Sequence, residues 1–86
     1  METAKLEIAI IRTVAENVRS LRKQAGLSQE ELAHEAGLDR TYISQVEREK
    51  RNVTIAVLAR IAAALGIGPD QLLASPSAAK ARRKRD

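Results

Sequence analysis

Cysteine, tryptophan and phenylalanine are missing from the chain, and Tyr42 is its only aromatic residue. Without cysteine the protein can form neither a disulfide nor a thiolate metal site, which fits a reducing cytosol. A core with so few aromatic rings must consist of Leu, Ile, Val and Ala, and this composition favours helices packed through small residues over a β-sandwich. The sequence therefore predicts an all-α fold.

A membrane span, a targeting signal and a catalytic motif are missing as well. No apolar run approaches the roughly 20 residues of a membrane-spanning helix, and the N-terminus lacks the layout of a secretory signal. His34 is the only histidine, without companions at a metal-binding spacing, and there is no phosphate loop, triad or carboxylate pair. We expect a cytoplasmic protein with no enzymatic activity, cofactor, metal, small-molecule ligand or membrane contact.

The net charge of +4 comes from the C-terminus. Residues 80–86, KARRKRD, hold five basic side chains and one acidic one, whereas the rest of the chain has ten of each. Evidence for DNA binding by the folded part must therefore come from where its charges lie. The composition after Ser75 predicts a disordered basic tail, 75–86, behind a folded domain of residues 1–74.

Two short helical patterns separated by one glycine occupy residues 29–48. Ser28 and Glu31 form the S-x-x-E capping box of a helix start. Gly37 can adopt the left-handed conformation that ends that helix, and Asp39 is suited to cap the next one. The spacing thus predicts two helices joined by a very short turn.

So short a turn makes two helices cross steeply, with small residues such as Ala33 and Gly37 at the closest approach. Ile43 and Val46 supply the apolar stripe of the second helix. The pattern indicates a helix-turn-helix, which presents its second helix to the major groove of DNA.

Three further helices are expected around this motif. The first begins between Thr3 and Lys5, runs to Ala25 and stops at Gly26. Its inward stripe comprises Ile11, Val14, Val18, Leu21 and Ala25. Leu6, Ile8 and Ile10 fall partly off that stripe, and either a neighbouring subunit or a packed or frayed helix extension would account for them.

The other two helices follow the motif. Thr54 is expected to cap a fourth helix that Gly66 ends. Its inward residues are Leu58, Ile61, Ala62 and Leu65. Gly68-Pro69 then opens a short fifth helix, because proline suits a first helical turn.

Several short motifs carry a resemblance to a known family. They are Asn17-Val18-Arg19, Leu21-Arg22, Gly26-Leu27-Ser28-Gln29, Ala36-Gly37-Leu38, Tyr42-Ile43-Ser44, Val46-Glu47-Arg48, Lys50-Arg51-Asn52-Val53 and 62–66. Through them the chain resembles the lambda-repressor-like, or Cro/Xre-type, helix-turn-helix family from Val14 to Leu73. Residues 38–58, LDRTYISQVEREKRNVTIAVL, are similar to the controller proteins of restriction–modification systems, which are small homodimeric regulators. Glu49 departs from the family pattern, which usually has glycine there, so the left-handed helix cap is expected to be missing.

The resemblance implies a compact five-helix DNA-binding domain whose second motif helix reads bases. We expect base contacts from Arg40, Thr41, Tyr42, Ser44 and Gln45. The Arg40 guanidinium suits guanine O6 and N7, and Gln45 could read adenine. A purely packing role for Tyr42 is equally consistent with the sequence. Ordinary solvation is the alternative for this whole polar face.

Phosphate contacts need only donors at suitable positions. We expect them from Ser28, Gln29, Arg48, Lys50, Arg51 and Asn52. The N-terminus of the first motif helix favours an anion near Gln29. Solvation could explain any one of these polar residues, but less readily the whole group.

Glu47 shares the inward face of its helix with Ile43 and Val46, so its charge needs a partner. Arg22 borders the inward stripe of the first helix and is the natural partner. The sequence predicts a buried structural ion pair, and the family resemblance supports it.

A single recognition helix reads too few base pairs to find one site in a genome. We therefore expect a homodimer on a palindromic or pseudo-palindromic operator in double-stranded DNA, with the recognition helices about 34–36 Å apart. The fifth helix is too short to bury all its apolar residues, which points to a symmetric interface there. The expected interface residues are Leu65, Ile67, Leu72 and Leu73.

The sequence thus predicts a nucleoid-associated transcription regulator, and a restriction–modification controller is one form it could take. The alternative is an antitoxin that covers a toxin with its tail and autoregulates its operon through the helix-turn-helix. A neighbouring methyltransferase or endonuclease gene favours the controller, and a small toxin gene favours the antitoxin.

Overall fold

The computed structural model describes residues 2–75, and the expected tail beyond Ser75 lies outside them. The described part contains α1 (Thr3–Gln24), α2 (Gln29–Ala36), α3 (Arg40–Glu47), α4 (Ile55–Leu65) and α5 (Asp70–Leu73). There is no strand in this part, so the all-α prediction is confirmed. None of the helices in residues 2–75 is long and apolar enough to cross a membrane.

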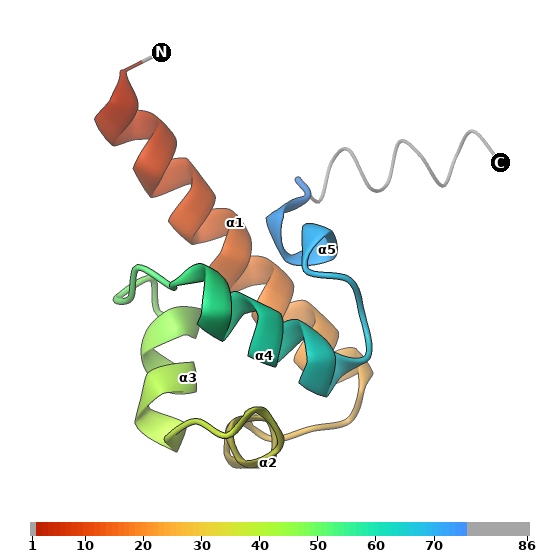
Figure 1. Cartoon of the computed structure of the whole chain (residues 1–86). Helices are drawn as coiled ribbons and strands as arrows, with labels where there is room; N and C mark the ends of the chain where they lie inside the picture. Colours follow the sequence, from red (N-terminus) through yellow and green to blue (C-terminus); the bar gives the residue numbers. More distant parts are fainter. Residues whose placement is uncertain (1, 76–86) are drawn as a thin grey trace, which may run out of the picture.

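α3, α4 and α5 pack against α1, and α2 lies on the far side of α3 and α4 (Figure 1). α2 packs against both α3 and α4, and α3 and α5 both contact α1. The N-terminal turns of α1 project beyond the other helices in Figure 1. Leu6, Ile8 and Ile10, in the N-terminal half of α1, are exposed.

A single aliphatic core joins the helices. Its largest fully buried side chains are Leu32, Ile43, Ile61, Leu72, Val18 and Val46. In α1, Val14 and Val18 are buried as predicted. Ala25 lies outside the core, contrary to the prediction, because α1 ends at Gln24 and the chain turns away. Ala15, which the predicted stripe omitted, is buried instead.

α1, α2, α3 and α4 end in the same way. In each, a residue with positive φ follows the last turn, and the next amide bonds back to a carbonyl of that turn. The left-handed residues are Gly26, Gly37, Glu49 and Gly66. The expectation that the left-handed cap of α3 is missing is therefore wrong.

Glu49 takes the conformation that glycine adopts at the other three ends, with φ +62°. The Lys50 amide donates to the Gln45 carbonyl at 2.8 Å, which closes the end of α3. A side chain pays a steric cost in this conformation because Cβ crowds the following carbonyl. The direction in which the chain leaves α3 thus imposes strain on Glu49.

The docking of α5 corrects one predicted interface residue. Leu72 is fully buried in the core, and the Asn17 side chain in α1 donates to the Leu72 and Ala74 carbonyls, both at 2.9 Å. Leu65 and Ile67 are partly buried against the core. Leu73, which is 50% exposed, is the one predicted interface residue with a large free surface.

Candidate nucleic-acid interface

The turn between α2 and α3 is built from local caps. The Ser28 hydroxyl accepts from the Glu31 amide at 3.0 Å, while the Glu31 carboxylate accepts from the Ser28 amide at 2.8 Å. Asp39 accepts from the Thr41 amide at 2.8 Å. These bonds lower the pKa of both carboxyls because they favour the charged form. The capping box and the Asp39 cap are confirmed.

The inner face of α3 is fully buried. Ile43 has no exposed surface, and Val46 and Glu47 are 2% and 3% exposed. Two apolar side chains fix the depth of the helix in the core, while the carboxylate fixes its rotation through hydrogen bonds. α3 is therefore presented to solvent in a single orientation.

The Glu47 carboxylate joins α3 to α1 and α2. Arg22 donates from Nε to Oε2 at 2.6 Å and from Nη2 to Oε1 at 3.1 Å. Gln29 donates from Nε2 to Oε1 at 3.1 Å, and Arg19 donates to the Glu47 carbonyl at 2.8 Å. The expected Arg22–Glu47 contact is thus present, and the roles of Arg19 and Gln29 in it were missed.

The charge of Glu47 is stabilised despite its burial. Burial by itself raises the pKa of this carboxyl, but the hydrogen bonds from Arg22 and Gln29 and the charges of Arg22 and Arg19 outweigh that effect. The pKa of Glu47 consequently lies below its ordinary value. The pKa of Arg22 is raised, mainly by its hydrogen bond to Glu47.

The outer face of α3 carries polar side chains that point to solvent. Arg40 and Thr41 in the first turn are exposed, and Ser44 and Gln45 are partly exposed. Tyr42 is partly buried and packs against the core. The structure thus brings the five predicted base-contacting residues onto one helix, with four of them on its accessible side.

The connector after α3 carries most of the predicted phosphate contacts. Arg48, Lys50 and Asn52 are exposed, and Arg48 Nε lies 3.4 Å from the Ser44 carbonyl oxygen. Arg51 instead folds back over α3, where it contacts Tyr42 and Gln45. The basic connector therefore borders the outer face of α3 on one side.

Ser28 and Gln29 stand at the N-terminus of α2. The Gln29 side chain turns towards Glu47, and the Ser28 hydroxyl already accepts the capping bond. An anion at this end of α2 would be bound mainly by backbone N–H groups, because the first amides of a helix have no intrahelical acceptor.

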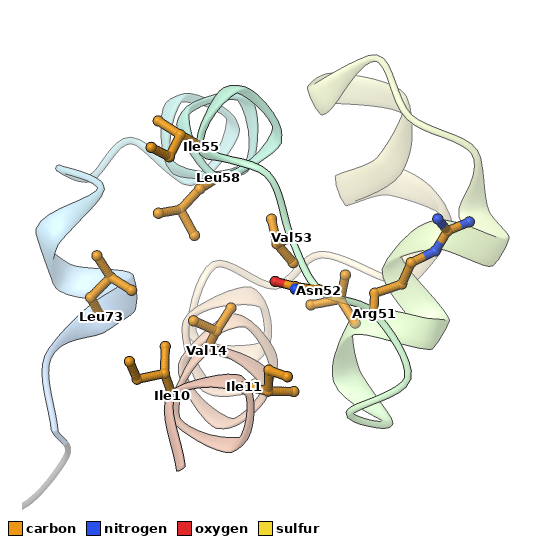
Figure 2. Close-up of a pocket in the computed structure, with 10 residues that line it drawn as sticks. Ile10, Ile11, Val14, Arg51, Asn52, Val53, Ile55, Leu58 and Leu73 are labelled. Carbon is orange, nitrogen blue, oxygen red and sulfur yellow. The ribbon is translucent and has the colours of Figure 1, made fainter. Parts of the chain in front are cut away.

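An apolar groove lies between α1, α5, the start of α4 and the connector residues Arg51, Asn52 and Val53 (Figure 2). Its volume is about 170 Å³, and its apolar lining includes Ile10, Ile11, Val14, Ile55, Leu58 and Leu73. Ile55 is 88% exposed. Within residues 2–75 no cluster of His, Cys, Asp and Glu side chains could hold a metal ion.

Comparison with known proteins assigns the chain to one family by both a family model and individual relatives. Residues 18–72 match the family model described as helix-turn-helix. A hypothetical transcription factor of Neisseria meningitidis is 49% identical over 63 residues, and the match spans 73% of this chain but only 59% of that relative. The control protein C.SmaI of Serratia marcescens is 53% identical over 60 residues, which cover 70% of this chain and 71% of that protein.

Solved structures show the same relationship. The restriction–modification controller protein C.AhdI from Aeromonas hydrophila superposes with a TM-score of 0.72 at 44% identity, covering 74% of this chain and 97% of that one. The controller protein C.Esp1396I, as a tetramer in complex with its natural 35 base-pair operator, superposes with a TM-score of 0.69 at 36% identity. That match covers 73% of this chain and 83% of that one.

Proposed function

The chain belongs to the helix-turn-helix family, and we propose that it is a sequence-specific transcription regulator that binds operator DNA as a homodimer. The observation that carries this proposal is α3, whose inner face is buried and hydrogen-bonded while its outer face is polar and accessible. A rigid helix with free donors on one side is what readout in the major groove requires. The similarity to control proteins of restriction–modification systems favours a regulator of that kind over an antitoxin.

Base readout is assigned to the outer face of α3. Arg40 is the first residue of the helix, where the guanidinium can reach deepest into a groove, and its paired donors match guanine O6 and N7. Thr41 adds a hydroxyl and a methyl group, and Ser44 is small enough to let the helix approach the bases.

Phosphate contacts are assigned to the two ends of the motif. The N-terminus of α2 offers backbone amides and a favourable dipole. Arg48 and Lys50 in the connector offer exposed donors on the other side, whereas the exposed Asn52 also lines the apolar groove. Such contacts position the domain without reading sequence.

We assign the interface with the second subunit of the homodimer to the apolar groove and its rim. Leu6, Ile8, Ile10, Ile55 and Leu73 are the large apolar side chains that stay exposed in residues 2–75. Ile10, Ile55 and Leu73 also line the groove, so this surface has both projecting and recessed apolar parts. A two-fold partner can fill the groove of each copy with the rim of the other.

DNA selection tests the proposed function. The full chain is used to select binders from a random pool of duplex DNA, and the DNA upstream of its own gene is then footprinted. We expect an inverted repeat with half-site centres about one helical turn, 34–36 Å, apart. Enrichment of no sequence at low and moderate salt would contradict the proposal, because purely electrostatic binding is blind to sequence.

The dimer surface is tested with Leu73→Arg by analytical ultracentrifugation. A buried charge in the groove should convert the dimer to a monomer and weaken operator binding. Gln71→Arg is the matched control, because Gln71 is exposed on the same short helix and does not line the groove. A Leu73→Arg protein that sediments as a dimer and binds the operator like the parent would place the interface elsewhere.

A further inference from the structure

Arg51 contacts α3, the helix proposed to read bases. These contacts have no part in the proposed function. Its Nε donates to Gln45 Oε1 at 2.8 Å. Its guanidinium carbon lies 4.4 Å from the centroid of the Tyr42 ring, a cation–π distance. Arg51 is thus held at two points above the outer face of α3, although it belongs to the connector.

The contact decides which way the Gln45 amide points. A glutamine amide has an oxygen that accepts and an NH₂ that donates, and a free amide can present either one by rotating half a turn. Arginine has donors only. Arg51 therefore holds the oxygen on its own side, so the NH₂ of Gln45 forms the other end of the amide.

The two purines differ in what they offer to this arrangement. Guanine presents two acceptors, N7 and O6, whereas adenine presents the N7 acceptor and the N6 amino donor. Adenine readout by glutamine needs the amide oxygen to accept from N6. In this protein Arg51 donates to one of the two lone pairs of that oxygen, and its positive charge opposes the approach of a second donor to the other. The NH₂ of Gln45 and the guanidinium together form a surface of donors that suits guanine.

We propose that Arg51 is a specificity-determining residue that, by holding Gln45 Oε1, makes Gln45 a reader of guanine and not of adenine. This inference rests on the proposed function and replaces the sequence-based expectation that Gln45 reads adenine. Tyr42 supports the arrangement as the platform under the guanidinium.

The experiment is selection from a random duplex pool with the full chain and three variants. Gln45→Ala identifies the base pair that Gln45 reads, because preference disappears there. Arg51→Met keeps an apolar stem over Tyr42 and removes every donor. At the position that Gln45→Ala identifies, the wild type is expected to select guanine. Arg51→Met is expected to lower the ratio of guanine to adenine by about fivefold or more.

Arg48→Met is the matched control. Arg48 is an exposed connector arginine whose hydrogen bond goes to a backbone carbonyl, not to a side chain that faces DNA. This variant should weaken binding to all sequences alike and leave the selected guanine unchanged.

Three results would overturn the proposal. The wild type could select adenine at the Gln45 position, or Arg51→Met could retain the same guanine preference there. A guanine preference that survives Gln45→Ala and is lost in Arg51→Met would assign the base to Arg51 itself. Each of these leaves sequence-specific binding intact, whereas a wild type that enriches no sequence would overturn the proposed function.

Discussion

The two faces of α3 differ in burial and in hydrogen bonding. The inner face is buried, and Glu47 receives hydrogen bonds from both α1 and α2. The outer face holds its side chains in or near solvent. The two faces of this eight-residue helix therefore have different roles. Substitutions on the inner face should change the stability of the fold. Substitutions on the outer face should change which DNA sequence is bound.

The largest expected effect comes from breaking the inner face. Glu47→Ala leaves the charge of the partly buried Arg22 without its carboxylate, with the Leu27 carbonyl as its remaining acceptor, and we expect a loss of about 3–5 kcal/mol in the free energy of unfolding. Urea titrations followed by circular dichroism, at equal protein concentrations, measure this loss.

An exposed ion pair in the same molecule is the control. Arg12 and Glu49 lie 3.5 Å apart, with 61% and 41% of their side chains exposed. Arg12→Ala should therefore cost no more than about 1 kcal/mol. Similar losses in Glu47→Ala and Arg12→Ala would mean that burial adds nothing to the Glu47 cluster.

Acid should remove part of the same stabilisation. The folded-state pKa of Glu47 lies below the ordinary value of 4.5, so its contribution is fully present above that pH and is lost as the pH falls through the folded pKa. Glu47→Gln, which cannot titrate, should be less stable at neutral pH and lose less stability on acidification. Parallel stability–pH curves for parent and variant would contradict this role of Glu47.

The smallest effect is expected at the end of α3 and has the opposite sign. Glu49→Gly removes the steric cost of a positive φ and should stabilise the protein by about 1 kcal/mol, less whatever the exposed pair with Arg12 contributes. Glu49→Ala removes the pair without relieving the backbone, so it should not stabilise. Thermal unfolding of the two variants separates these effects, and a gain in Glu49→Ala equal to that in Glu49→Gly would show that the backbone is unstrained.

Local features of the fold could be predicted from the sequence because their causes are local. The capping box at Ser28 and the left-handed Gly37 depend on residues a few positions apart. The burial of Leu72 could not be predicted in this way. It depends on how α5 docks against Asn17, which is 55 residues away in the chain. The conformation of Glu49 follows from the path of the chain after α3 and not from the preference of glutamate.

In the candidate site, too, some features could be predicted from the sequence and others could not. Helical periodicity placed Arg40 on the outer face and Glu47 on the inner face of α3, because both positions follow from one helix. It could not show that Arg51 returns to Gln45, since that contact depends on the turn after α3 and on side-chain rotamers. It also missed Gln29 as a partner of Glu47, because the crossing of α2 and α3 sets that distance.

The central claim is that the outer face of α3 reads bases while the inner face stabilises the fold. Its most direct test is the affinity of Arg40→Ala for operator DNA and for random DNA. Arg40 is exposed at the start of α3. We expect operator binding to lose about 1–3 kcal/mol, with relaxed preference at one base pair per half-site. Binding to random DNA should change far less, and the unfolding free energy should stay that of the parent. An equal loss on both DNAs would make Arg40 a phosphate contact and contradict base readout by the outer face of α3.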